Sequence, residues 1–214
     1  GSGLMRDPKK AEAIIRAVVA ATDLPVSVKF RLGWDETCIN VDELAVMAEE
    51  LGVKEIAVHG RTRQQQYSGT ADYEAIARIR EKLTIPVIAN GDVTSPESAR
   101  RILAQTGAAG LMIGRAAMGN PWLFRAVRQD MAGQPLTAVT LTERIDTALL
   151  QAQWMMDYKG ERLGIMEMRK HVGHYIGGVR GATAIRRELN LTTTLDQMRR
   201  LLNQLRAAGE EQTL

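Results

Sequence analysis

The chain has 214 residues, of which 45% are hydrophobic and 25% charged, and its formal net charge is +3. This length suits one large domain or one and a half smaller ones, and no apolar run is long enough to cross a bilayer. Cys38 is the only cysteine, which excludes an internal disulfide and predicts a reducing compartment, the cytoplasm.

Strands and helices alternate from the N-terminus to about Gly133. After a leading helix, Pro8 to Ala21, strands are predicted over Val26 to Phe30, Glu55 to His59, Val87 to Asn90 and Leu111 to Gly114. Each strand is followed by a helical pattern, over Val41 to Leu51, Tyr73 to Leu83, Pro96 to Gln105 and from about Asn120. The strand starts are roughly 25 to 30 residues apart, the length of a βα unit, and this predicts an α/β fold with a parallel sheet.

Four such units make half of a (β/α)8 barrel, which needs eight strands and about 250 residues. We therefore expect the C-terminal half of a parallel barrel. A flavodoxin-like sheet is the alternative, and it is less favoured because Lys29 and Arg31 lie on the same face of a strand. A doubly wound sheet would bury both cations under helices.

The second part of the chain has no strand signal. Helices are predicted over Thr140 to Tyr158, Glu161 to Ile176, Thr183 to Leu189 and Leu195 to Ala207. Gln134-Pro135 is the predicted linker, so residues 1–133 form the barrel half and residues 140–214 an all-α domain. We expect the last residues, Gly209 to Leu214, to fray.

Two strand-like runs end in residues that suit an anion. The first ends at Asn90-Gly91-Asp92 and the second at Gly114-Arg115. Glycine lets backbone N–H groups approach an anion closely, and arginine adds a charged donor. Because (β/α) barrels hold phosphate in the loops after their last two strands, the pair predicts a ligand that carries phosphate.

Other candidate residues follow the first two strands. Lys29 lies near a strand end, where it can hold negative charge on a reduced cofactor or extend into solvent. His59 can donate to a ligand oxygen or bond a neighbouring loop. Arg61 begins a basic loop that either reaches a substrate or is a solvated connection. Cys38 has no histidine nearby to activate it, and no residues have the spacing of metal ligands.

Cations gather in the helical part between Arg162 and Arg187. Mixed with histidine and tyrosine, they suit a nucleic-acid backbone with exposed bases, although a solvated helix face can carry the same charges. The candidate RNA-contacting residues are Arg169, Lys170, His171, Tyr175, Arg180, Arg186 and Arg187.

Taken together, these motifs occur in the order found in tRNA-dihydrouridine synthases, and the chain resembles that family over nearly its whole length. It is most similar to the bacterial B-type enzymes. The matching segments are residues 28–34, 58–62, 88–92, 112–116 with 119–122, and 168–171 with Tyr175.

The resemblance implies an FMN-binding (β/α)8 barrel joined to a helical tRNA-binding domain, in an enzyme that is a monomer at full length. In that family NADPH reduces the flavin, the flavin passes a hydride to C6 of a uracil flipped out of tRNA, and a cysteine protonates C5. The product is 5,6-dihydrouridine. Carried over by motif, Lys29 contacts the flavin ring, His59 lies beside the cofactor, Arg31 faces the base, and the phosphate is held by Asn90, Gly91, Asp92, Gly114 and Arg115.

The chain departs from the family pattern at the proton donor. The family's cysteine lies in a Gly-Cys-Pro setting after the fourth barrel strand, whereas the strands here correspond to strands five to eight. Cys38 follows the fifth strand and does not match, so we expect no catalytic residue in this chain and an inactive C-terminal fragment. Two alternatives stay open: another FMN barrel of the dihydroorotate or dihydropyrimidine dehydrogenase type, and a non-catalytic RNA-binding fragment.

Overall fold

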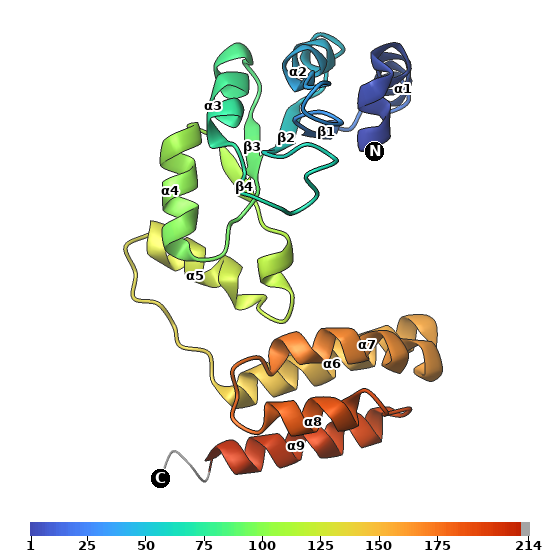
Figure 1. Cartoon of the computed structure of the whole chain (residues 1–214), viewed down its shortest axis with the longest axis vertical. Coiled ribbons are helices and arrows are strands. Elements are labelled where there is room, and N and C mark those ends of the chain that lie inside the picture. The colour runs from blue at the N-terminus through green and yellow to red at the C-terminus, as the bar shows by residue number, and fades with distance from the viewer. Residues whose placement is uncertain (211–214) are drawn as a thin grey trace. The chain divides into compact units, whose positions relative to one another are not determined.

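A computed structural model of the chain describes residues 1–210, and contacts divide it into two compact units. The first unit is Gly1–Gly114, and the second begins at Arg115 (Figure 1). None of the helices in residues 1–210 combines the length and the apolar character that crossing a bilayer requires.

The first unit is built on a parallel sheet of four strands in the order β1-β2-β3-β4. The strands are β1 (Ser27–Arg31), β2 (Glu55–His59), β3 (Val87–Asn90) and β4 (Gly110–Met112). The helices are η1 (Ser2–Arg6), α1 (Pro8–Ala20), α2 (Val41–Glu50), α3 (Tyr73–Lys82) and α4 (Pro96–Thr106). Every strand and helix predicted up to residue 114 is confirmed, with boundaries that differ by at most two residues.

The strand order shows how the sheet is wound. Because β-α-β crossovers are right-handed, strands added always in the same direction place their connecting helices on the same face. Figure 1 shows α2, α3 and α4 on one side of the strands. A doubly wound sheet reverses its strand order, so the flavodoxin-like alternative is wrong. The α/β fold with a parallel sheet is confirmed.

Alternation along the strands separates a buried face from a polar one. Apolar side chains that face the helices are buried, and they include Phe30, Ile56, Val58, Val87 and Ala89. The helices supply the other half of this core through Ile15, Leu44, Ile76, Ile79 and Ile102. Apart from Ala89, each of these side chains contributes about 1.5–3 kcal/mol by leaving water. Their burial fixes the strand register and therefore which side chains lie on the opposite face.

Helix α4 begins close to the end of β3 because its first turn is capped. The Ser95 hydroxyl accepts from the Ser98 N–H at 3.2 Å, and the Ser98 hydroxyl accepts from the Ser95 N–H at 2.9 Å. Pro96 occupies the first turn, where a missing N–H costs nothing. This capping box fixes the chain just beyond the turn after β3 that is predicted to bind an anion.

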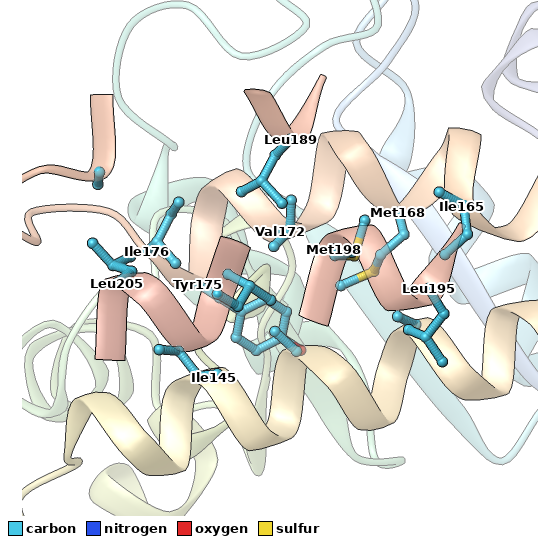
Figure 2. Close-up of a cluster of buried hydrophobic side chains, with 14 residues drawn as sticks. Ile145, Ile165, Met168, Val172, Tyr175, Ile176, Leu189, Leu195, Met198 and Leu205 are labelled. Atoms are coloured by element: carbon cyan, nitrogen blue, oxygen red, sulfur yellow. The ribbon is translucent and has the colours of Figure 1, made fainter. Parts of the chain in front are cut away.

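The second unit contains only helices within its described residues. They are η2 (Arg115–Ala117), α5 (Trp122–Met131), α6 (Leu141–Lys159), α7 (Glu161–Tyr175), α8 (Ala182–Leu189) and α9 (Leu195–Glu210). Figure 2 shows their buried apolar side chains, with Met168, Met198 and Leu195 close together. The four predicted helices are therefore confirmed. Helix α9 continues through Gly209 and Glu210, where fraying was predicted, and residues 211–214 lie outside the described part.

The division between the units falls at Gly114, before α5, whereas the sequence placed a domain boundary near Gly133. Helix α5 belongs to the second unit because its side chains are attached there. Trp122 meets the ring of Tyr175 edge-on, with centroids 6.2 Å apart. Composition cannot indicate side-chain contacts of this kind. The predicted boundary rested only on the polar segment that follows α5.

That polar segment, residues 134–140, is irregular, as the linker prediction requires. It is nevertheless tied to α5. The Gln129 side chain donates to the Thr137 hydroxyl at 2.7 Å and accepts from the Thr137 N–H at 3.1 Å. The segment is therefore a connection inside the second unit.

Candidate functional site

The carboxyl ends of the strands bring polar residues into one row across the sheet. The register pairs Arg31 with His59, His59 with Asn90, and Asn90 with Met112. Paired residues of neighbouring strands point to the same face, and Lys29 lies two residues before Arg31 on that face. The structure thus brings together Lys29, Arg31, His59 and Asn90, which the sequence had placed only one strand at a time.

Arg61 lies beneath this row and is only 1% exposed. Its Nε donates to the Ser68 carbonyl at 3.0 Å, and its Nη2 donates to the Gly69 carbonyl and to Oδ2 of Asp92, both at 2.6 Å. Its Nη1 lies 3.5 Å from Nε2 of His59. The prediction that Arg61 contacts a substrate is corrected here, because the loop folds around the guanidinium instead of presenting it to solvent.

The turn after β3 has an unusual backbone. Gly91 has a φ of +133° and Asp92 a φ of +52°, a region that non-glycine residues rarely adopt. The Asp92 carboxylate, which accepts from Arg61 and from the Ala71 N–H at 3.0 Å, holds this conformation. A Cβ on Gly91 would lie 2.7 Å from that of Ala71, so only glycine fits. Because the Asp92 side chain is used in this way, only its backbone can face a phosphate.

The other residues predicted to bind an anion, Asn90, Gly114 and Arg115, are placed differently. The Asn90 side chain donates from Nδ2 to the Met112 carbonyl at 2.7 Å, which links the ends of β3 and β4. A Cβ on Gly114 would meet nothing within 4 Å among the described atoms, so the space beside it is open. Arg115 opens η2 and is the first residue of the second unit.

Positive charge dominates the strand ends. Asp92 pairs with Arg61, whereas neither Lys29 nor Arg31 forms an ion pair within the described residues. Partial burial, and then Arg31, lowers the pKa of Lys29. Burial, followed by Arg31, Lys29 and Arg61, lowers the pKa of His59 to about 4, so this histidine is neutral at pH 7. A face with unneutralised cations favours an anionic ligand.

Arg31 also shapes the loop after β2. Its Nη1 donates to the Thr62 carbonyl at 2.8 Å and to the Gln66 carbonyl at 3.2 Å. Burial lowers the pKa of Arg31; Tyr67 raises it to a smaller extent, and Arg63 and Arg61 lower it further. The other two guanidinium nitrogens make no hydrogen bond within residues 1–210, so Arg31 can hold the loop and still face a ligand.

In the second unit, three of the predicted RNA-contacting residues serve the fold. Arg169 donates through Nε, at 2.8 Å, and through Nη2 to the Thr192 carbonyl. Tyr175 is 5% exposed, and its hydroxyl donates to Gln151. Arg186 is exposed, but its Nη2 donates to the Gly173 carbonyl at 2.7 Å. The prediction for Tyr175 is corrected, because a buried ring cannot stack on a base. Arg169 gives two of its three guanidinium nitrogens to the Thr192 carbonyl, so its main contact lies inside the unit.

The remaining members of the predicted set do face solvent. Lys170, Arg180 and Arg187 are exposed and His171 is half-buried. None of the four makes a side-chain hydrogen bond or ion pair to the described residues. They are therefore the members of the set that can meet a polyanion.

Sequence reasoning missed two exposed aromatic residues on α6. Trp154 is 62% exposed and Tyr158 87% exposed. The helical period could have revealed their exposure, because they lie on the opposite side of the helix from Ile145, Ala148 and Ala152, which are buried. Exposed aromatic rings are the side chains on which unpaired bases stack.

Nearly the whole chain matches a known protein family. The family described as "Dihydrouridine synthase (Dus)" matches residues 1–212. The "tRNA-dihydrouridine synthase B" of Pseudomonas aeruginosa is 44% identical over 191 residues, which cover 89% of this chain and 58% of that protein. The "Probable tRNA-dihydrouridine synthase 1" of Synechocystis is 42% identical over 205 residues, or 95% of this chain and 58% of that protein.

The chain spans a little over half the length of these relatives. Among solved structures, a mandelate oxidase mutant with (S)-mandelic acid aligns with a TM-score of 0.33 and 16% identity. That alignment covers 93% of this chain and 66% of the oxidase, and a score this low carries no argument about the fold.

Proposed function

Because this chain belongs to the dihydrouridine synthase family, we propose that it forms part of an enzyme that reduces uridine in tRNA to 5,6-dihydrouridine. The cofactor is FMN, and NADPH is the reductant. The observation that carries the proposal is the row of Arg31, His59 and Asn90 beside the Gly91–Asp92 turn, in a chain whose relatives are named tRNA-dihydrouridine synthases.

The sheet is proposed to be half of a (β/α)8 barrel. Its strands follow one another in order, which leaves β1 and β4 as edges within the described residues. Beside β1 lies a cavity of about 500 Å³ with a largely apolar lining that includes Met5, Ile14, Ile15, Val18 and Phe30. Further strands of the longer protein pair with these edges in this proposal, and the helices from α6 onward form the tRNA-binding domain.

The residues present fit a flavin mononucleotide. The left-handed backbone at Gly91 and Asp92 and the open space at Gly114 are features of an anion site, and Lys29 adds a cation on the same face. Asn90, the backbone of Gly91 and Asp92, and Gly114 hold the phosphate in this proposal. Bound FMN supplies hydride transfer, which no side chain can perform.

In this proposal the chain's own residues bind the cofactor and orient the base. Lys29 places a positive charge where negative charge develops during reduction. His59 is neutral at pH 7 and offers a hydrogen bond without adding charge. The two guanidinium nitrogens of Arg31 that make no hydrogen bond within residues 1–210 are proposed to face the base. No proton donor is assigned among residues 1–210, and Cys38 is assigned no role.

For RNA, the contacts are proposed to come from Lys170, His171, Arg180 and Arg187. The cations meet phosphates, and Trp154 and Tyr158 can stack on unpaired bases.

The activity is tested in the intact enzyme. A bacterial strain that lacks its own dihydrouridine synthases is complemented with it, and tRNA nucleosides are analysed by mass spectrometry. We expect dihydrouridine to return, and the purified protein to retain FMN that NADPH bleaches. Flavin reduction with no change in tRNA would instead favour another FMN dehydrogenase, and tRNA binding without flavin would favour an RNA-binding module.

A further inference from the structure

Arg61 has no route to a ligand, yet it touches two parts of the candidate site. Four of its donor contacts are satisfied inside the protein, by Ser68, Gly69, Asp92 and His59. A guanidinium holds up to five donors in a rigid plane, so the four acceptors also fix its own orientation. One of these acceptors is the imidazole of His59, and the contact with Arg61 affects which ring nitrogen carries a proton and can donate a hydrogen bond.

We propose that Arg61 is a positioning residue that holds His59 as the neutral tautomer with its proton on Nδ1. A guanidinium can only donate, so Nε2 of His59 is the acceptor of the Arg61 Nη1–H. The imidazole proton is thereby confined to Nδ1. This leaves Nδ1–H as the only donor of the ring, on the face that it shares with Lys29 and Asn90.

The charges around the ring support the same assignment. Lys29 and Arg31 face His59 from β1, and Arg61 faces it from the loop after β2. Among these neighbours only Asn90, on β3, favours the protonated ring, and the Asp92 carboxylate is paired with Arg61. These three cations disfavour a positive charge on the imidazole. A second proton, on Nε2, would also point at the Arg61 guanidinium.

Arg61 also links this effect to the phosphate turn. Its ion pair with Asp92 holds a residue whose φ is +52°, so one side chain sets both the donor of His59 and the turn after β3. That this donor and this turn serve a flavin rests on the proposed function, whereas the tautomer does not.

The test is nitrogen NMR of the whole chain without cofactor. Long-range proton–nitrogen correlation at pH 7 reports which ring nitrogen carries the proton, and His59→Gln identifies the signal among the three histidines. We expect His59 with a proton on Nδ1 and none on Nε2. A proton on Nε2, or a charged ring at pH 7, would overturn the assignment in the unaltered protein.

Two variants separate the role of Arg61 from folding. In Arg61→Gln, the side-chain amide can accept as well as donate, so we expect mixed tautomers and an upward shift of the His59 pKa. Arg61→Lys keeps the charge but lacks the planar, forked set of donors that reaches His59 and Asp92 together. We therefore expect mixed tautomers in this variant as well. An unchanged His59 spectrum in a folded Arg61→Gln protein would contradict the role. If the tautomer is as expected but FMN does not bind, the proposed function fails and the positioning role stands.

Discussion

Lys29 is proposed to act through the position of its amine on the polar face of the sheet. Its side chain reaches solvent and forms no ion pair within residues 1–210, while the partial loss of water around its amine, and then the charge of Arg31, lower its pKa. We predict that Lys29→Ala in the intact enzyme reduces dihydrouridine formation by about tenfold or more, because one donor is lost where charge develops. Initial rates from nucleoside mass spectrometry measure this.

Folding should be little affected, since an exposed side chain makes few contacts that stabilise the unit. Lys54→Ala is the matched control, because Lys54 is also an exposed lysine next to the sheet but lies before β2. Equal turnover of the Lys29→Ala enzyme, with full FMN content, would remove Lys29 from the chemistry.

His59 gives a prediction about pH. Its pKa is about 4 in the folded protein and 6.5 in the unfolded chain. Between these values the unfolded state binds more protons, so the free energy of unfolding falls as the pH is lowered from 6.5 to 4 and is unaffected by this group above 6.5. Urea unfolding at a series of pH values measures the slope.

The variant His59→Asn should lose this part of the pH dependence, whereas His171→Asn, in the other unit, should keep it. An identical slope in the His59→Asn protein would show that other groups cause it.

At the scale of elements, α6 and α7 pack closely because Gly164 has no side chain. A Cβ there would lie 2.8 Å from the Met155 carbonyl, which belongs to α6. We predict that Gly164→Ala lowers the free energy of unfolding by about 1–3 kcal/mol, because the backbone of one helix must move.

Gly173 is the matched control in the same helix, since its nearest atom, on Arg186, would be 3.8 Å away. Gly173→Ala should stabilise by about 0.5–1 kcal/mol through helix propensity alone. Denaturant unfolding followed by circular dichroism measures both variants. Equal effects of the two substitutions would show that the helices are not in close contact at Gly164.

For the whole molecule, the prediction concerns tRNA. Reversing Arg186 and Arg187 together would also disturb the fold, because Arg186 donates to the Gly173 carbonyl. We therefore predict that Arg187→Glu and Lys170→Glu together weaken tRNA binding and reduce the salt dependence of log K by about 0.9 for each phosphate that is no longer neutralised. NADPH oxidation should stay nearly unchanged.

Arg200→Glu on α9 carries the same kind of charge change outside the proposed surface and should leave the affinity close to normal. Filter binding at several salt concentrations measures the slope. The same affinity in the double variant as in the unaltered enzyme would exclude these cations from the interface.

The sequence by itself determined the elements and their type. Glu55 to His59 and Val87 to Asn90 were predicted with the bounds that the structure shows, because β-rich runs there end at Gly60 and Gly91. The capped start of α4 was readable from Ser95 and Pro96. Local propensity, capping and hydrophobic period depend on neighbours in the chain, so the chain alone reports them.

Only the tertiary structure decided which polar residues are free. Arg61, Arg169 and Tyr175 have the composition of a binding surface, but their partners Asp92, Thr192 and Gln151 lie more than 20 residues away in the sequence. The consecutive strand order, which excludes a doubly wound sheet, and the attachment of α5 to the helical unit were decided in the same way. A buried hydrogen bond or a ring contact forms between residues that folding brings together, and no local pattern records that choice.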